Sequence, residues 1–189
     1  MSKITDNLLV RGARGKMGNQ FVYKQRGEDT FITRMPKINK NAVPTESQEK
    51  MRDRFGEASL YAQGAMADAD LKEAYQRKLA PGKTAYNAAF RDYLKAPAVT
   101  GIDAAQYNGQ PGQRITVRAK DDFRVAGVQV SIRTATGELV EAGEAVLDPI
   151  NRNRWIYTTR AINPAMPGSS VEVTARDIPG NEGKQQLTL

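Results

Sequence analysis

Residues 171–181 read Val-Glu-Val-Thr-Ala-Arg-Asp-Ile-Pro-Gly-Asn, and this stretch decides the fold class. Apolar Val171, Val173 and Ala175 alternate with polar residues, which is typical of a β-strand that buries one face. The Pro-Gly-Asn that follows is a strong turn signal. The stretch therefore predicts a half-buried strand followed by a tight turn.

The same pattern recurs through the second half of the chain. Alternating apolar residues occupy 115–119, 128–132 and 155–157, and the chain ends in Leu187-Thr-Leu. Turn signals separate these runs at Asn108-Gly109, Pro111-Gly112, Thr136-Gly137 and Pro167-Gly168. About seven short strands with a turn roughly every ten residues predict an antiparallel β-sandwich over residues 97–189. Trp155 is expected in its core.

These runs, together with the Ala175-Arg-Asp177 strand end and the Gly180-Asn181 turn, resemble bacterial immunoglobulin-like domains. The resemblance covers residues 98–189 and implies an immunoglobulin-like sandwich. It implies no particular chemistry, because such domains serve as spacers, adhesins and virion decorations. The N-terminal half, with Gly15-Lys-Met-Gly-Asn-Gln-Phe-Val-Tyr and Pro44-Thr-Glu-Ser-Gln, is similar to small uncharacterised bacterial and phage-associated proteins. That similarity transfers no activity.

Residues 41–96 have helical periodicity. Thr45-Glu-Ser-Gln48 fits a capping box that opens a first helix. Asp68 or Asp70 is expected to cap a second helix and Thr84 to start a third. Apolar residues at helical spacing in the first helix are Met51, Phe55, Ala58, Ala62 and Ala65. This segment therefore predicts a small unit of three short helices.

Residues 1–40 predict a β-hairpin. Phe21-Val-Tyr-Lys-Gln and Thr30-Phe-Ile-Thr-Arg-Met flank a glycine-containing loop. Apolar side chains fall on both faces of each strand, and a two-stranded hairpin alone is marginal in water. The segment therefore needs the helices or another subunit. The predicted fold class is α+β, with an N-terminal β-hairpin and three short helices before an immunoglobulin-like antiparallel β-sandwich.

The positive charge is concentrated near the N-terminus. The chain carries +7 overall, and residues 1–40 hold nine basic and three acidic side chains. A nucleic-acid backbone and an acidic protein surface are both candidate partners for this segment. Acidic residues of the sandwich that could serve as such a surface are Asp121, Asp122, Glu138, Glu141 and Glu144. The predicted basic patch is Arg11, Arg14, Lys16, Lys24, Arg26 and Arg34.

The composition argues against catalysis. The chain has no cysteine and no histidine, which excludes disulfides, thiolate ligands and the commonest general base near neutral pH. Gly12-Ala-Arg-Gly15-Lys16 departs from a phosphate-binding loop, since two residues instead of four separate its glycines and Met17 follows the lysine. No enzyme activity, cofactor or metal is predicted. A weak calcium alternative uses Asp103, Asp121, Asp122, Asp177 and Asn181 at one end of the sandwich.

No stretch approaches the roughly 20 apolar residues of a membrane helix, so no membrane insertion is expected. Leu8-Leu9-Val10 is too short for the core of a signal peptide. Synthesis in the cytoplasm without a signal peptide is therefore predicted. The final location is open, with a virion or an extracellular assembly as alternatives.

Self-assembly is the predicted function. A basic, β-prone segment precedes two units that do not obviously need it, and such a segment can dock onto another copy. The expected product is a homo-oligomer or polymer, such as a virion, tube or surface-filament subunit. The alternative is a nucleic-acid-binding protein that uses the same segment. The predicted assembly interface is Phe21, Val22, Tyr23, Phe31 and Ile32.

Overall fold

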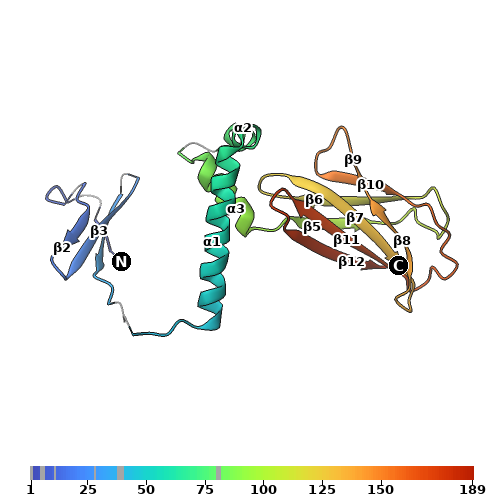
Figure 1. Cartoon of the computed structure of the whole chain (residues 1–189), viewed down its shortest axis with the longest axis horizontal. Coiled ribbons are helices and arrows are strands. Elements are labelled where there is room, and N and C mark those ends of the chain that lie inside the picture. The colour runs from blue at the N-terminus through green and yellow to red at the C-terminus, as the bar shows by residue number, and fades with distance from the viewer. Residues whose placement is uncertain (1, 5–6, 11, 28, 38–40, 80–81) are drawn as a thin grey trace. The chain divides into compact units, whose positions relative to one another are not determined.

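The computed structural model describes residues 2–4, 7–10, 12–27, 29–37, 41–79 and 82–189 (Figure 1). The chain divides into two compact units, residues 1–45 and residues 46–189. Together they contain helices and antiparallel strands, so the predicted α+β class with a β-sandwich is confirmed.

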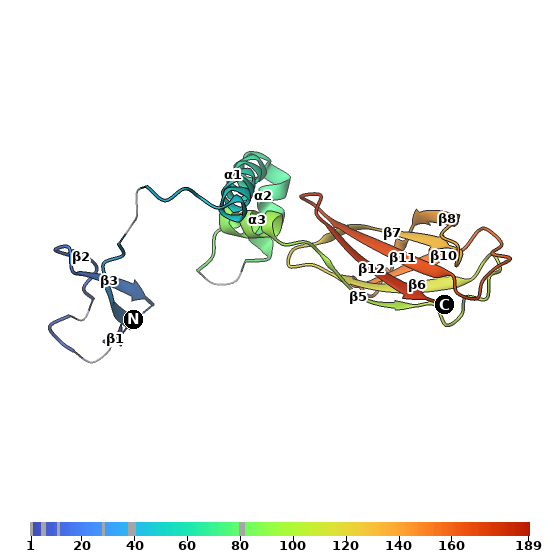
Figure 2. The same cartoon turned by 90° about the horizontal axis from the view of Figure 1, so that it is seen from below.

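The first unit is a four-stranded antiparallel sheet with the order β1-β4-β3-β2. The central pair is β3 (Phe21–Arg26) and β4 (Asp29–Arg34), and the chain turns between them at Gly27, which has φ +62°. β1 (Ser2–Lys3) pairs with β4, and β2 (Gly15–Met17) pairs with β3 (Figure 2). The sequence predicted only the central pair, because short segments of two and three residues become strands through pairing rather than through their own periodicity.

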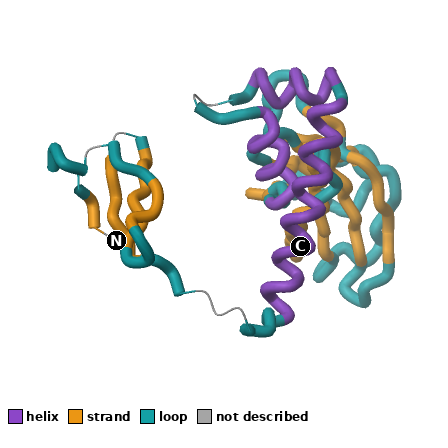
Figure 3. Tube along the Cα trace, turned by 60° about the vertical axis from the view of Figure 1, so that its left-hand side comes forward, coloured by secondary structure: helices purple, strands orange, loops and turns teal. Residues whose placement is uncertain are grey.

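Three helices open the second unit: α1 (Glu46–Ala67), α2 (Ala69–Arg77) and α3 (Ala85–Leu94). Two of the predicted caps are confirmed, since Asp68 accepts from the Leu71 amide at 2.8 Å and Thr84 accepts from the Asn87 amide at 3.2 Å. The first turns of α1 extend beyond α2 and α3 (Figure 3). Met51 and Phe55 are 60% and 59% exposed, although the Phe55 ring contacts Phe90 of α3 with the centroids 4.7 Å apart. The rest of the predicted stripe, Ala58, Ala62 and Ala65, is buried.

The sandwich consists of two four-stranded antiparallel sheets. One sheet has the order β5-β6-β10-β9, formed by Ala98–Asp103, Arg114–Lys120, Arg154–Thr158 and Val146–Leu147. The other has the order β12-β11-β7-β8, formed by Glu182–Thr188, Ser170–Asp177, Val125–Arg133 and Leu139–Glu144. Alternate residues of the central strands fill the core between the sheets. Trp155 is only 6% exposed there, as predicted.

The helices and the sandwich share core residues. Phe123, in the loop between β6 and β7, belongs to the buried cluster of the helices together with Tyr75, Ala85 and Ala89. The rings of Phe123 and Tyr75 stack with their centroids 4.0 Å apart. The helical segment therefore completes its core with a side chain from the sandwich. None of the helices in the described part of the chain is long and apolar enough to cross a membrane.

Candidate assembly interface

The register of the N-terminal sheet separates its side chains into two faces. Because successive residues of a strand point to opposite sides, Phe21 and Tyr23 share one face of β3, and Val22 and Lys24 share the other. We call the first the aromatic face, formed by Met17, Phe21, Tyr23, Ile32 and Arg34. We call the second the lysine face, formed by Lys3, Lys16, Val22, Lys24 and Phe31.

The aromatic face is held together by cross-strand pairs. Phe21 lies between Met17 of β2 and Arg34 of β4, and Tyr23 pairs with Ile32. The Tyr23 hydroxyl donates to the Met17 sulfur at 3.7 Å. Met17 and Phe21 remain 61% and 41% exposed. A row of large apolar side chains is thus left open on one side of the sheet.

The lysine face carries most of the charge of the sheet. Lys24 and Lys3 flank Phe31 on neighbouring strands, and Lys16 pairs with Val22. Lys3 forms an ion pair with Asp29 at 3.0 Å. Within the described ranges, no ion pair involves the exposed Lys16 or Lys24. This face therefore has two free ammonium groups beside a half-buried aromatic ring.

The predicted site residues fall on both faces. Phe21, Tyr23 and Ile32 lie on the aromatic face, whereas Val22 and Phe31 lie on the lysine face. Among the predicted basic residues, Lys16 and Lys24 lie on the lysine face, Arg34 lies on the aromatic face and Arg14 is exposed just before β2. Arg26 ends β3, and Arg11 lies outside the described residues.

The N-terminal sheet has almost no interior. Thr30 is the only buried residue among those described in residues 2–45. Its side chain accepts from the Gly12 amide at 3.3 Å, so the loop around Gly12 covers that end of the aromatic face. Beside Phe21 and Arg34, at the other end, lies an open hollow of about 620 Å³ that Pro36 and Lys37 also line. A single sheet layer normally buries one face against a second layer.

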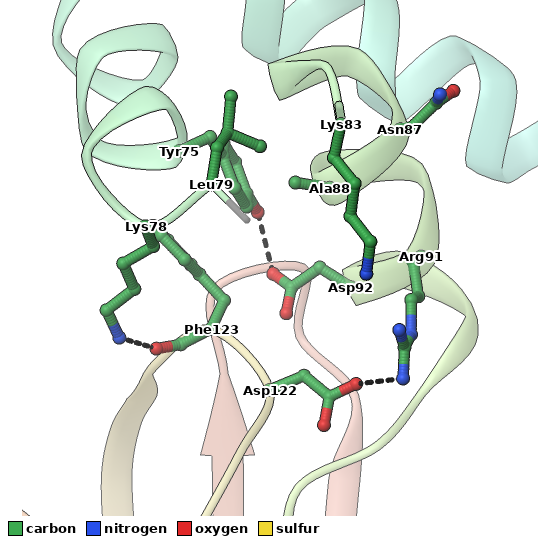
Figure 4. Close-up of a pocket in the computed structure, with 10 residues that line it drawn as sticks. All are labelled: Tyr75, Lys78, Leu79, Lys83, Asn87, Ala88, Arg91, Asp92, Asp122 and Phe123. Atoms are coloured by element: carbon green, nitrogen blue, oxygen red, sulfur yellow. Dashed lines mark hydrogen bonds and ion pairs between the residues drawn. The ribbon is translucent and has the colours of Figure 1, made fainter. Parts of the chain in front are cut away.

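A polar site lies in the unit of residues 46–189, between the helices and the β6–β7 loop (Figure 4). It surrounds a pocket of about 300 Å³. Asp122 forms ion pairs with Arg91 at 3.0 Å and Lys95 at 2.5 Å. The hydrogen bond from Lys95 is the main reason why the pKa of Asp122 lies below its usual range. The Lys78 ammonium donates to the Phe123 carbonyl.

Asp92 of α3 is buried in this site. It is 2% exposed, and its Oδ2 accepts from the Tyr75 hydroxyl at 2.6 Å. Burial raises the pKa of Asp92 to about 7, and the nearby Asp121 adds to that effect. Asp177 is held by Asn181, whose side-chain amide also donates to the backbone carbonyls of Asp92 and Tyr93.

Asp92 was not among the predicted site residues, although the residue spacing of α3 contains a signal for it. Ala85, Ala89 and Asp92 follow one another at helical spacing and are all buried. A carboxylate on a buried helical stripe needs a partner, and its partners come from α2 and the sandwich. The residue spacing along α3 therefore identifies Asp92 as a buried carboxylate, but it does not identify the residues of other elements that contact Asp92.

The predicted calcium residues do not form one site. Asp121, Asp122, Asp177 and Asn181 lie at the end of the sandwich that faces the helices, whereas Asp103 lines a separate hollow with Arg114 and Arg154. In the part of the chain that the structure describes, no group of three or more acidic side chains could hold a metal ion. Asp121 and Asp122, proposed as an acidic docking surface, already have partners in their own unit.

No protein-family model matches the chain, and no curated protein matches it. Seven chains of solved structures do match. One is the crystal structure of CopC from Methylosinus trichosporium OB3b, which is 16% identical and has a TM-score of 0.34. The match covers 49% of this chain and 91% of that one. A likeness of this size supports no argument about function.

Proposed function

We propose that this protein is a non-catalytic structural subunit that associates with its own copies through the aromatic face of the N-terminal sheet. The observation that carries the proposal is the near-absence of an interior in that sheet. Thr30 is its only buried residue among those described, while Met17 and Phe21 are 61% and 41% exposed. A sheet of this kind gains stability when a second layer covers it.

The charges favour a second copy on the aromatic face. Arg34 is the only charged member of that face, whereas the lysine face has three lysines. Two lysine faces would repel one another, and two aromatic faces would bring few like charges together. Full burial of a side chain such as Phe21 or Ile32 contributes about 1.5–3 kcal/mol. Covering these side chains would contribute to the free energy that offsets the cost of association.

The sandwich is proposed to be immunoglobulin-like. Labelled A to G in chain order, with β8 as an extra C′ strand, its sheets read A-B-E-D and G-F-C-C′. This pairing is the one that immunoglobulin folds use. Such a domain suits the exposed part of a virion, tube or surface filament, because it needs no partner to fill its core. The N-terminal sheet would then provide the contact between subunits.

The test is the mass of the full chain against a variant that lacks residues 1–40, measured by analytical ultracentrifugation and negative-stain imaging. We expect the full chain to form oligomers and the shortened chain to be a monomer. The shortened chain keeps the unit of residues 46–189 with its own cores, so it should remain folded. An oligomer that persists unchanged after the deletion would exclude this interface.

A nucleic-acid-binding role is the second candidate, because the lysine face places Lys3 and Lys24 on either side of Phe31. Ammonium groups neutralise phosphates, and an aromatic ring on a sheet can stack on a base. Binding of this kind weakens steeply with salt, whereas apolar association does not. Titration of the full chain with labelled single-stranded DNA and RNA at several salt concentrations separates the two functions.

A further inference from the structure

Two buried carboxylate oxygens face the boundary between α3 and the sandwich without a partner. Among the described residues, neither Asp92 Oδ1 nor Asp121 Oδ1 has a hydrogen bond. The other oxygen of each group is satisfied, by the Tyr75 hydroxyl at Asp92 and by the amides of Phe123 and Arg124 at Asp121. A buried acceptor left without a donor is destabilising. Asp92 and Asp121 are close enough to share a hydrogen bond, so a single donor between them would satisfy both oxygens.

We propose that Asp92 and Asp121 share one proton, and that this proton fastens α3 to the β6–β7 loop of the sandwich as a pH-sensitive joint. In the protonated pair, Asp92 donates a hydrogen bond to the Asp121 carboxylate. Loss of the proton leaves two negative charges side by side in a buried site. The two states therefore differ in how firmly the helices hold the sandwich.

The groups around Asp92 favour its protonated form over its ionised form. Burial raises the pKa of Asp92 to about 7, and the charges of Asp121 and Asp177 act in the same direction. Tyr61 and Tyr75 supply only neutral hydroxyls on the helical side, and the pKa of each is raised. The charged groups around the adjoining pocket are Lys78, Lys83, Arg91 and Asp122.

The nearby cations do not neutralise the pair. Arg91 forms an ion pair with Asp122, and Lys78 donates to the Phe123 carbonyl. Lys83 is exposed at the rim of the pocket, and no ion pair joins it to Asp92 in the described part of the chain. A metal ion is also a poor substitute, because no group of three or more described acidic residues could hold one. A proton is thus the positive charge that fits the site.

The direction of the pH effect follows from the pKa. Asp92 has a raised pKa in the folded protein, against 3.8 in an ordinary environment, so the folded chain binds more protons between these values. The stabilisation is complete below pH 3.8 and is lost as the pH rises through about 7. The chain has no histidine and no cysteine. No histidine or cysteine side chain therefore titrates alongside Asp92 near neutral pH.

The first experiment is a carboxyl-carbon NMR titration of the full chain labelled at aspartate. One aspartate should titrate with a midpoint near pH 7, and its signal should disappear in the Asp92→Asn variant. If every aspartate of the wild-type protein titrates below pH 5, no proton is shared and the proposal is wrong.

The second experiment measures the thermal midpoint at pH 5.5 and pH 8. The wild-type midpoint should fall by several degrees between these values. Asp92→Asn replaces the acid with an amide that can accept from Tyr75 and donate to Asp121, so its midpoint should be independent of pH and above that of the wild type at pH 8. Asp121→Asn should likewise lose the pH dependence, which provides a second variant if the first fails to fold.

Asp122→Asn is the matched control, because Asp122 lies on the same loop but pairs with Arg91 and Lys95. It should lower the midpoint at both pH values and keep the wild-type difference between them. Loss of that difference in the control would contradict the proposal. So would a wild-type midpoint at pH 8 that millimolar calcium restores to its pH 5.5 value, because a metal ion would then fill the site.

Discussion

The two β regions of this protein are built from similar sequence patterns but bury very different amounts of surface. In the sandwich, Ile115, Val117 and Val130 are 0% exposed because each sheet covers the other. In the N-terminal sheet, Thr30 alone among the described residues is buried, and Phe21 is 41% exposed. Alternating apolar residues therefore indicate that a strand has a face to bury. They do not indicate what covers that face.

The largest expected effect lies in the sandwich core. Ile115→Ala should lower the free energy of unfolding by about 2–5 kcal/mol, because it removes a fully buried side chain and leaves a cavity. Urea denaturation followed by the fluorescence of Trp155, the single tryptophan, measures it. Ile32→Ala in the N-terminal sheet is the counterpart and should leave this transition unchanged. Equal losses for the two variants would mean that the two regions do not differ as described.

Association should depend on the aromatic face. Phe21→Ala should weaken self-association about 10- to 100-fold, the equivalent of roughly 1.5–3 kcal/mol for a large apolar side chain that becomes buried. Sedimentation equilibrium at several concentrations gives the dissociation constant. Val22→Ala, one residue away on the lysine face, is the control and should change it little. The opposite ranking would assign the interface to the lysine face.

Residue periodicity predicted the parts of the structure that depend on local sequence. The run around Val128 and Val130 became β7, and the cap at Thr84 began α3. Periodicity could not predict β2, whose three residues become a strand only by pairing with β3. It also could not place Phe123 in the helical core, because that contact joins segments far apart in the chain.

The candidate site was predictable only in part. The sequence indicated apolar side chains on both faces of the hairpin, but the predicted interface combined them in one set and the predicted basic patch combined the charges in another. The strand register places members of each set on both faces of the sheet. Arg34 lies on the aromatic face with Phe21, and Lys24 lies on the lysine face with Phe31. The alternation of Phe21, Val22, Tyr23 and Lys24 along β3 already contains this division. The register of β2 and β1, which completes the two faces, required the structure.

Salt provides a smaller and complementary effect. Apolar association through the aromatic face should change its dissociation constant by less than about threefold between 50 and 500 mM sodium chloride, because Arg34 is the one charged side chain among the residues that define this face. The Lys16→Gln/Lys24→Gln double variant should associate as the wild type does. A steep salt dependence that this variant abolishes would favour a charged partner on the lysine face.

A small effect is also expected in α1. Gly64 is an exposed helical glycine, and a Cβ added there would meet no atom within 4 Å. Gly64→Ala should therefore raise the free energy of unfolding by about 0.5–1 kcal/mol. The gain should appear in the urea transition of the second unit and leave the dissociation constant unchanged. A change in association instead would place α1 at the subunit contact.

The stacking of Phe123 on Tyr75 has a consequence for how the chain matures during translation. The helices leave the ribosome first, yet the ring that completes their interior arrives only with the loop after β6. Until that loop emerges, the Phe123 ring cannot stack on Tyr75, and the core of the nascent helices lacks this contact. The core of the helices is therefore completed by a segment that is synthesised after them.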